Sequence, residues 1–186
     1  MAYYGLVIVA MLFVFTQPAL QSSLIQLIRL SLNQTLPSVV KAYDNKDFLL
    51  AVALTFLFNL AMGAFVVITL PNFVVPYWGV VIGMFRAVTW GLLLAPSQSA
   101  LAVAMIPHSL TVILEGQGYI IAIFASYLQW QAVLKPDSVG AASRWSAYKI
   151  SLMRTIRLYF LVALVLAMAA IYESFEVIYM VPLLIH

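Results

Sequence analysis

Residues 108–130 read HSLTVILEGQGYIIAIFASYLQW, an apolar run interrupted by a single carboxylate, Glu115. A helix needs roughly 20 apolar residues to cross the hydrocarbon core of a bilayer, so this run predicts a transmembrane helix. An ionisable side chain at the centre of a bilayer costs at least about 2.5–3.5 kcal/mol. Glu115 is therefore expected to face a partner or a cavity rather than lipid.

The composition of the whole chain agrees with this reading. Hydrophobic residues make up 65% of the 186 residues and charged residues only 8%, whereas a soluble domain carries about 25% charged residues. No polar stretch is long enough to form a soluble domain, so residues 1–186 are expected to form one transmembrane domain. The absence of cysteine excludes disulfides and thiolate metal sites.

Apolar runs that can form further spans recur along the chain, and they predict an all-α polytopic transmembrane bundle of about five spans. The expected spans are residues 3–20, 48–70, 77–94, 108–130 and 152–171. Pro18 removes a backbone donor and should kink or end the first helix. Residues 1–35 are therefore expected to cross either once or twice, as a broken or kinked segment.

Basic residues near the span ends predict the orientation of a multi-pass protein of the cell membrane. The loop 131–157 carries five basic residues against two in the first loop, which places it in the cytoplasm. These residues are Lys135, Arg144, Lys149, Arg154 and Arg157, against Lys41 and Lys46. With five spans, the N-terminus is also cytoplasmic and the C-terminus is outside. Glu173 and Glu176 are expected at the outer interface. The short apolar tail after them, Val177–Ile185, is expected to lie along that interface or, the favoured arrangement, to dock on a partner subunit.

Polar groups on three neighbouring spans lie at matching depths. Asn59 precedes the turn residue Phe73 by 14 positions and Arg86 follows it by 13; Arg86 precedes Leu101 by 15 positions and Glu115 follows it by 14. At about 1.5 Å per residue, each group lies some 20 Å from its turn. The spacing predicts an intramembrane polar layer in which Arg86 and Glu115 form an ion pair, with Asn59 hydrogen-bonded nearby, or share a polar bridge through Asn59 or His108.

His108 is the fourth candidate member of this layer, because Arg86 aligns with it if the helix begins earlier, near Gln98. Three roles for the layer stay open: a buried pair that fixes helix register, a path for a substrate, proton or ion, and a contact between subunits. A metal site at His108 and Glu115 would need a third ligand, and the sequence offers none, so no metal or cofactor is expected. The sequence also lacks a nucleotide-binding, zinc-protease or serine-hydrolase motif, so the protein is not expected to be an enzyme.

Gly79 and Gly83 form a G-x-x-x-G pattern on the same helix face as Arg86. Small residues at this spacing allow two helix backbones to approach closely. The pattern predicts that both glycines contact a neighbouring helix, from this chain or from a second copy.

Several of these features occur together within residues 48–130: Asn59, the Gly79-x-x-x-Gly83 helix, Pro107-His108, Glu115, Gly116 and Gly118. In this combination the chain resembles the stage II sporulation protein M family of integral membrane proteins. The sporulation member of that family resembles a scaffold that bridges other proteins. The resemblance implies a non-enzymatic protein of membrane assembly or transport.

Two functions are compatible with the sequence. The first is a structural or scaffolding subunit of a larger membrane complex, since reactive motifs and soluble domains are absent. The alternative is an oligomeric transporter or channel component that uses the polar layer. The expected partners are the lipid bilayer and other membrane subunits or copies of the chain. No nucleic acid is expected, because the basic loop serves as a topology signal and a contact for anionic lipid.

Overall fold

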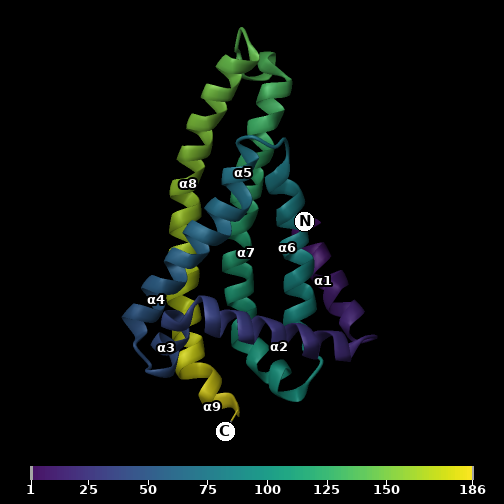
Figure 1. The fold of residues 1–186 in the computed structure, drawn as a ribbon, viewed down its shortest axis with the longest axis vertical. Coiled ribbons are helices and arrows are strands. Elements are labelled where there is room, and N and C mark those ends of the chain that lie inside the picture. The colour runs from purple at the N-terminus through teal and green to yellow at the C-terminus, as the bar shows by residue number, and fades with distance from the viewer. Residues whose placement is uncertain (1, 186) are drawn as a thin grey trace.

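The computed structural model describes residues 2–185, and the fold of these residues is all-α, without a strand (Figure 1). Segments η1 and η3 are π-helical and η2 is a 3₁₀ turn. In chain order the elements are α1 (Ala2–Val14), α2 (Pro18–Thr35), α3 (Pro37–Asp44), α4 (Phe48–Leu57), η1 (Phe58–Thr69), α5 (Leu70–Asn72), α6 (Trp78–Leu94), α7 (Ser99–Leu134), η2 (Pro136–Val139), α8 (Arg144–Phe175), η3 (Glu176–Met180) and α9 (Val181–Ile185).

Three helical rods are long and apolar enough to cross a membrane, as expected for a multi-pass membrane protein. They are Phe48–Asn72, Leu101–Leu134 and Arg144–Leu184. A fourth span is possible if Ala2–Val14 and Pro18–Ser31 count as one broken crossing, because they meet at a bend of 114°. The described residues thus offer three to four spans, where the sequence predicted about five.

The expected third span accounts for the difference. This segment is α6, which has 17 residues and is therefore only about 26 Å long. The fourth expected span also differs, because α7 begins at Ser99 and includes Pro107 within the helix instead of starting at His108. The predicted kink at Pro18 is confirmed by the bend between α1 and α2.

The longest helices, α7 and α8, pack as an antiparallel hairpin whose tip projects beyond the other elements (Figure 1). The tip turns at Gly140, which has a φ of 65°. Ser143 then caps α8 by accepting a hydrogen bond from the backbone of Ser146 at 3.2 Å. Of the basic loop predicted at 131–157, residues 135–143 form the tip of the hairpin, and four of its basic residues lie on α8: Arg144, Lys149, Arg154 and Arg157.

At the opposite end of the hairpin, α2 runs across the ends of the other helices (Figure 1). Its position is fixed by Gln21, which is fully buried. The Gln21 amide donates to the carbonyls of Leu93 at 3.0 Å and Ala95 at 2.7 Å, and it accepts from Ser97. These bonds satisfy carbonyls that the end of α6 leaves free.

Close helix contacts surround an apolar core shared by α1, η1, α6, α7 and α8. A Cβ added at Gly79 would lie 2.5 Å from Cβ of Ser126 on α7, and one at Gly83 would meet Ile123 on the same helix. Both glycines therefore face a helix of the same chain, one of the two arrangements that the G-x-x-x-G pattern predicts.

The C-terminal tail continues α8 as a helix through η3 and α9. Ile178 in this tail is buried and packs with Ala42 and Ala51 of α3 and α4. The tail was expected to lie along the outer interface or dock on a partner subunit, and the structure adds a contact of the tail with the chain itself. The helix continues because the apolar side chains after Glu176 can pack on the chain itself.

Candidate intramembrane polar site

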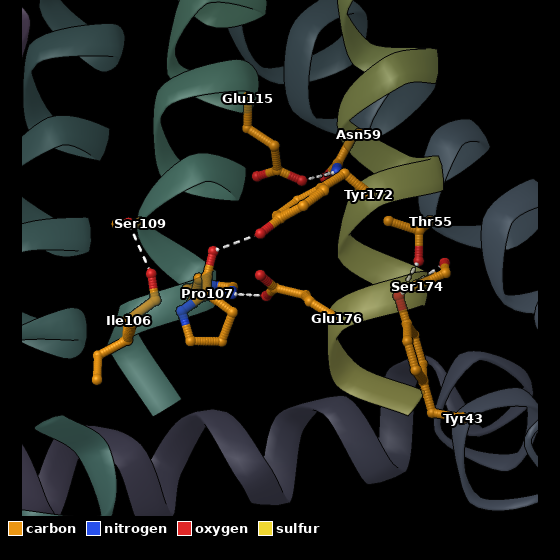
Figure 2. A network of polar contacts seen from close by, with 11 residues as sticks. Tyr43, Thr55, Asn59, Ile106, Pro107, Ser109, Glu115, Tyr172, Ser174 and Glu176 are labelled. Carbon is orange, nitrogen blue, oxygen red and sulfur yellow. Dashed lines mark hydrogen bonds and ion pairs between the residues drawn. The ribbon is translucent and has the colours of Figure 1, made fainter. Parts of the chain in front are cut away.

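A buried contact between His108 and Glu176 ties the start of α7 to the end of α8. His108 Nδ1 contacts the Glu176 carboxylate, and Glu176 is fully buried at the first position of η3. One turn earlier, Tyr172 donates a hydrogen bond to the Pro107 carbonyl at 3.0 Å (Figure 2). Glu176, which was expected at the outer interface, is thus buried in a polar site within the bundle.

A second set of contacts joins η1 to α7. The amide of Asn59 donates to the Glu115 carboxylate (Figure 2). The Tyr119 hydroxyl donates to Asn59 Oδ1 at 3.0 Å. Asn59 is the second residue of the π-helical segment, and π-helical distortions in proteins often occur at functional sites. The structure thus brings Asn59 and Glu115 together, as their matched depths predict.

Glu173, on α8, lines the same two cavities as Glu115 of α7. Glu173 was expected at the outer interface with Glu176, and the structure places it beside these cavities. Both glutamates lie within the rod Arg144–Leu184, beyond the point where the sequence ended the span.

Arg86 is held by aromatic rings rather than by a carboxylate. Its guanidinium carbon lies 3.9 Å from the ring centroid of Tyr119 and 5.3 Å from that of Trp90. Cation–π contacts of this kind stabilise by about 2 kcal/mol when they are desolvated. No ion pair joins Arg86 to Glu115 in the described part of the chain, so the direct pair, the first of the two predicted links, is absent. The link between them runs through Tyr119 and Asn59.

The polar side chains line two adjoining cavities at the α2 end of the molecule. One cavity, of about 410 Å³, lies between α3, α4, η1, α6, α7 and α8, and the other is about 320 Å³. Trp90, Glu115 and Glu173 line both. The first also contacts Asn59 and Arg86, and the second contacts His108 and Thr111. All four residues predicted for the polar layer therefore border these cavities.

Several buried polar atoms around the cavities lack a hydrogen-bond partner: Arg86 Nε, Thr111 Oγ1, Glu173 Oε2 and Glu176 Oε2. Thr111 is 2% exposed, and a threonine in a helix usually bonds to the carbonyl four residues earlier. That carbonyl belongs to Pro107 and is occupied by Tyr172. Leaving a buried polar group without a hydrogen bond costs about 1–3 kcal/mol of folding free energy. A ligand or a water molecule that bonds to these atoms would remove that cost.

Helix α3 covers the site from the α2 end. The Tyr43 hydroxyl bonds to Thr55 at 2.9 Å and to Ser174 at 3.3 Å (Figure 2). Burial raises the pKa of Tyr43 to about 12, so the hydroxyl keeps its proton at neutral pH. The cover is thereby tied to both α4 and α8.

Towards the hairpin tip, the apolar core closes the site. Tyr119, Ala122, Val162 and Leu166 are all buried there. Beyond this core lies a separate polar cluster centred on Asn72, which contacts Ser126, Gln129 and Gly79 at 3.1–3.2 Å. That cluster holds the turn between α5 and α6, so the cavities border the α2 end while the tip end is sealed.

Sequence reasoning missed Tyr119, Glu173 and Glu176. Tyr119 lies four residues after Glu115, on the same helix face, and this spacing was a usable signal. The two glutamates were missed because the apolar tail beyond them concealed how far the helix continues. In residues 2–185, no three histidine or acidic side chains form a group suited to a metal ion.

Comparison of the chain with known families, curated proteins and solved structures finds no match. The resemblance to the stage II sporulation protein M family therefore stays a prediction.

Proposed function

We propose that this chain is a membrane transport protein, or the transport subunit of a larger assembly, which binds a proton or another small cation in the polar site. The observation that supports this proposal is the placement of Glu115 and Glu173. Both carboxyl groups border both cavities, and one oxygen of Glu173 has no partner. Neither transport nor the scaffold alternative requires catalysis.

The main competing hypothesis is that the buried polar residues are only structural and fix the register of the packed helices. A cluster of that kind is favourable only when every buried member is hydrogen-bonded. Here Arg86 Nε, Thr111 Oγ1 and one oxygen each of Glu173 and Glu176 are unpaired. Incomplete pairing beside a cavity favours a binding site over a sealed structural pair.

The irregular helices around the site also support transport. The π-helix η1 begins one residue before Asn59, η3 begins at Glu176, and Pro107 lies inside α7 next to His108. π-helical segments within helices frequently occur at functional sites, and prolines and π-bulges are the usual places where helices kink. Three such irregular positions around one site favour a functional role over a purely structural one.

The orientation of the chain in the membrane is proposed from the basic residues of the α7–α8 hairpin. If the loop 131–157 is cytoplasmic under the positive-inside rule, the cavities face the outer side. The apolar core around Tyr119 and Leu166 then separates the site from the cytoplasm. Transport would require this barrier to open, so the structure corresponds to a state that faces one side.

The transport proposal is tested with purified protein in liposomes that contain a pH-sensitive dye and face gradients of protons, sodium or potassium. Wild-type protein is expected to carry at least one of these ions faster than protein-free liposomes. Glu173→Gln should abolish that flux, whereas Asp137→Asn at the exposed tip should not change it. Flux equal to that of empty liposomes for all three ions would refute the transport role.

A scaffold role is the second candidate, and an outer groove supports it. The groove, of about 460 Å³, lies between η1 and α8 and includes the small residues Ala61 and Ala163. Small residues on an outer face allow a partner helix to approach. Affinity purification in mild detergent tests this role, since a scaffold should retain stable heteromeric partners and Ala163→Phe should release them.

A further inference from the structure

We propose that the 410 Å³ cavity binds a small zwitterion, an aliphatic amino acid whose carboxylate pairs with Arg86 and whose ammonium group faces Glu115 and Glu173. All three side chains line this cavity. The inference rests on the proposed transport role and adds an organic substrate to it. The adjoining 320 Å³ cavity, next to His108, then keeps room for the cation of the proposed function.

Arg86 has a hydrogen-bond donor that the protein leaves unused. Its guanidinium is stacked on Tyr119, with 3.9 Å between the guanidinium carbon and the ring centroid. A stacked ring covers the face of the planar guanidinium and leaves the N–H groups, which lie in its plane, to other partners. The Nε atom is buried without a partner, and no carboxylate of the described residues forms an ion pair with Arg86. The carboxylate of a ligand matches these donors, because it can accept two parallel hydrogen bonds from one guanidinium.

The cavity holds basic and acidic groups that are kept apart from each other. Glu115 is bonded to the amide of Asn59, whose Oδ1 accepts a hydrogen bond from Tyr119 at 3.0 Å. The ring of the same tyrosine holds the guanidinium of Arg86, so the two charged groups occupy separate places on the cavity wall. A buried charge without a partner of opposite sign is unfavourable. A ligand with one charge of each sign at its two ends would satisfy both groups.

A ligand with a charge of only one sign fits the cavity less well. An anion would pair with Arg86 but would also meet Asp44, Glu115 and Glu173, which line the same cavity. Like charges repel strongly where the dielectric constant is low. A cation would pair with a carboxyl group but would leave Nε of Arg86 without a partner.

The walls and the size of the cavity favour an aliphatic amino acid among the zwitterions. Apolar side chains from α3, the residue before it, η1 and α6 form much of the wall: Leu36, Val39, Val40, Phe58 and Trp90. Pockets for small molecules usually have volumes of about 300–1,000 Å³. A cavity of 410 Å³ lies at the small end of this range, so it suits a single amino acid better than a peptide.

The test is equilibrium binding of radiolabelled L-leucine to the purified protein in mild detergent, with two unlabelled analogues as competitors. 3-Methylbutylamine lacks the carboxylate and 4-methylpentanoate lacks the ammonium group, so each keeps the side chain and one charge. Leucine is expected to bind saturably. Each analogue should compete at least about tenfold more weakly than unlabelled leucine, because it loses the charge-assisted hydrogen bonds of one end.

The variant Arg86→Gln separates the two ends of the ligand. It should weaken the binding of leucine at least about tenfold, and it should not weaken that of 3-methylbutylamine, which has no carboxylate for Arg86 to bind. Arg154→Gln is the matched control, because Arg154 is exposed on α8 and does not line the cavity. This control should bind leucine as the wild-type protein does.

Three results would overturn the proposal: no saturable binding of leucine, competition by either analogue as strong as that by leucine, or unchanged leucine binding in Arg86→Gln. If Arg86→Gln does not fold, the comparison of the two analogues on the wild-type protein decides. Leucine binding without ion flux into liposomes would refute the transport role alone, and ion flux without leucine binding would refute only the zwitterion site.

Discussion

Replacing Gly91 by alanine should weaken the packing of α1 against α6. A Cβ at this position would lie 2.5 Å from Cβ of Ala10 and closer still to the carbonyl oxygen of Val7. Ordinary contact begins at 3.4 Å, so α1 must move away by about 1 Å. Because a backbone atom is involved, a side-chain rotation cannot relieve the overlap.

Overpacking of this kind costs roughly 1–3 kcal/mol, and alanine recovers about 0.5–1 kcal/mol through its better helix propensity. The expected net loss for Gly91→Ala is about 1–2 kcal/mol. Gly5→Ala on α1 is the matched control, because its Cβ meets nothing within 4 Å and should stabilise by up to about 1 kcal/mol.

Unfolding by sodium dodecyl sulfate in mixed micelles, followed through the fluorescence of the 4 tryptophans, measures both variants. The difference between them should be about 2 kcal/mol, roughly a thirtyfold change in the ratio of folded to unfolded protein. If Gly91→Ala is as stable as the wild-type protein, the close approach of α1 and α6 is refuted.

Three further variants test separate parts of the fold by the same unfolding measurement. Gly140→Ala should lower the free energy of unfolding by about 1–2 kcal/mol because the φ of this residue is 65°, and Gly140→Asn should lower it less. If both variants are as stable as the wild-type protein, the turn geometry is contradicted. Gln21→Leu should cost about 1–3 kcal/mol, since it leaves the Leu93 carbonyl without its donor, and an unchanged midpoint would show that α2 is held otherwise. Asn59→Leu should be less stable than the double variant Asn59→Leu/Glu115→Leu, because the single change leaves a buried carboxyl group without its donor. A double variant that is less stable than the single one would argue against the contact.

The sequence predicts the depth of a polar residue along its helix better than the direction in which its side chain points. Counting residues from the turns places Asn59 and Glu115 at a common depth, and the structure joins them by a hydrogen bond. The same counting places Arg86 at that depth but does not give its direction around the helix axis. In the structure Arg86 turns to the rings of Tyr119 and Trp90, a choice that depends on helix rotation rather than on depth.

The ends of helices limit the prediction for a different reason. Glu173 and Glu176 look like residues at a membrane surface when the span is ended at Ile171. The helix instead continues, because Ile178 packs with Ala42 of the short helix α3. That contact joins residues far apart in the chain, and hydropathy along the sequence carries no information about it. The count of about five spans included α6, which is apolar but has only 17 residues.

The central claim is that the polar site is a binding site open to water from the α2 end, and cysteine accessibility tests it most directly. The chain contains no cysteine, so Thr111→Cys and Ala122→Cys each carry a single thiol. The two positions are 2% and 0% exposed, but Thr111 borders a cavity while Ala122 lies in the sealed core. A membrane-impermeant thiol reagent applied to protein in vesicles should modify Thr111→Cys from one side of the membrane and leave Ala122→Cys unmodified. Equal protection of both thiols from both sides would contradict the account, because the layer would then be a closed structural contact.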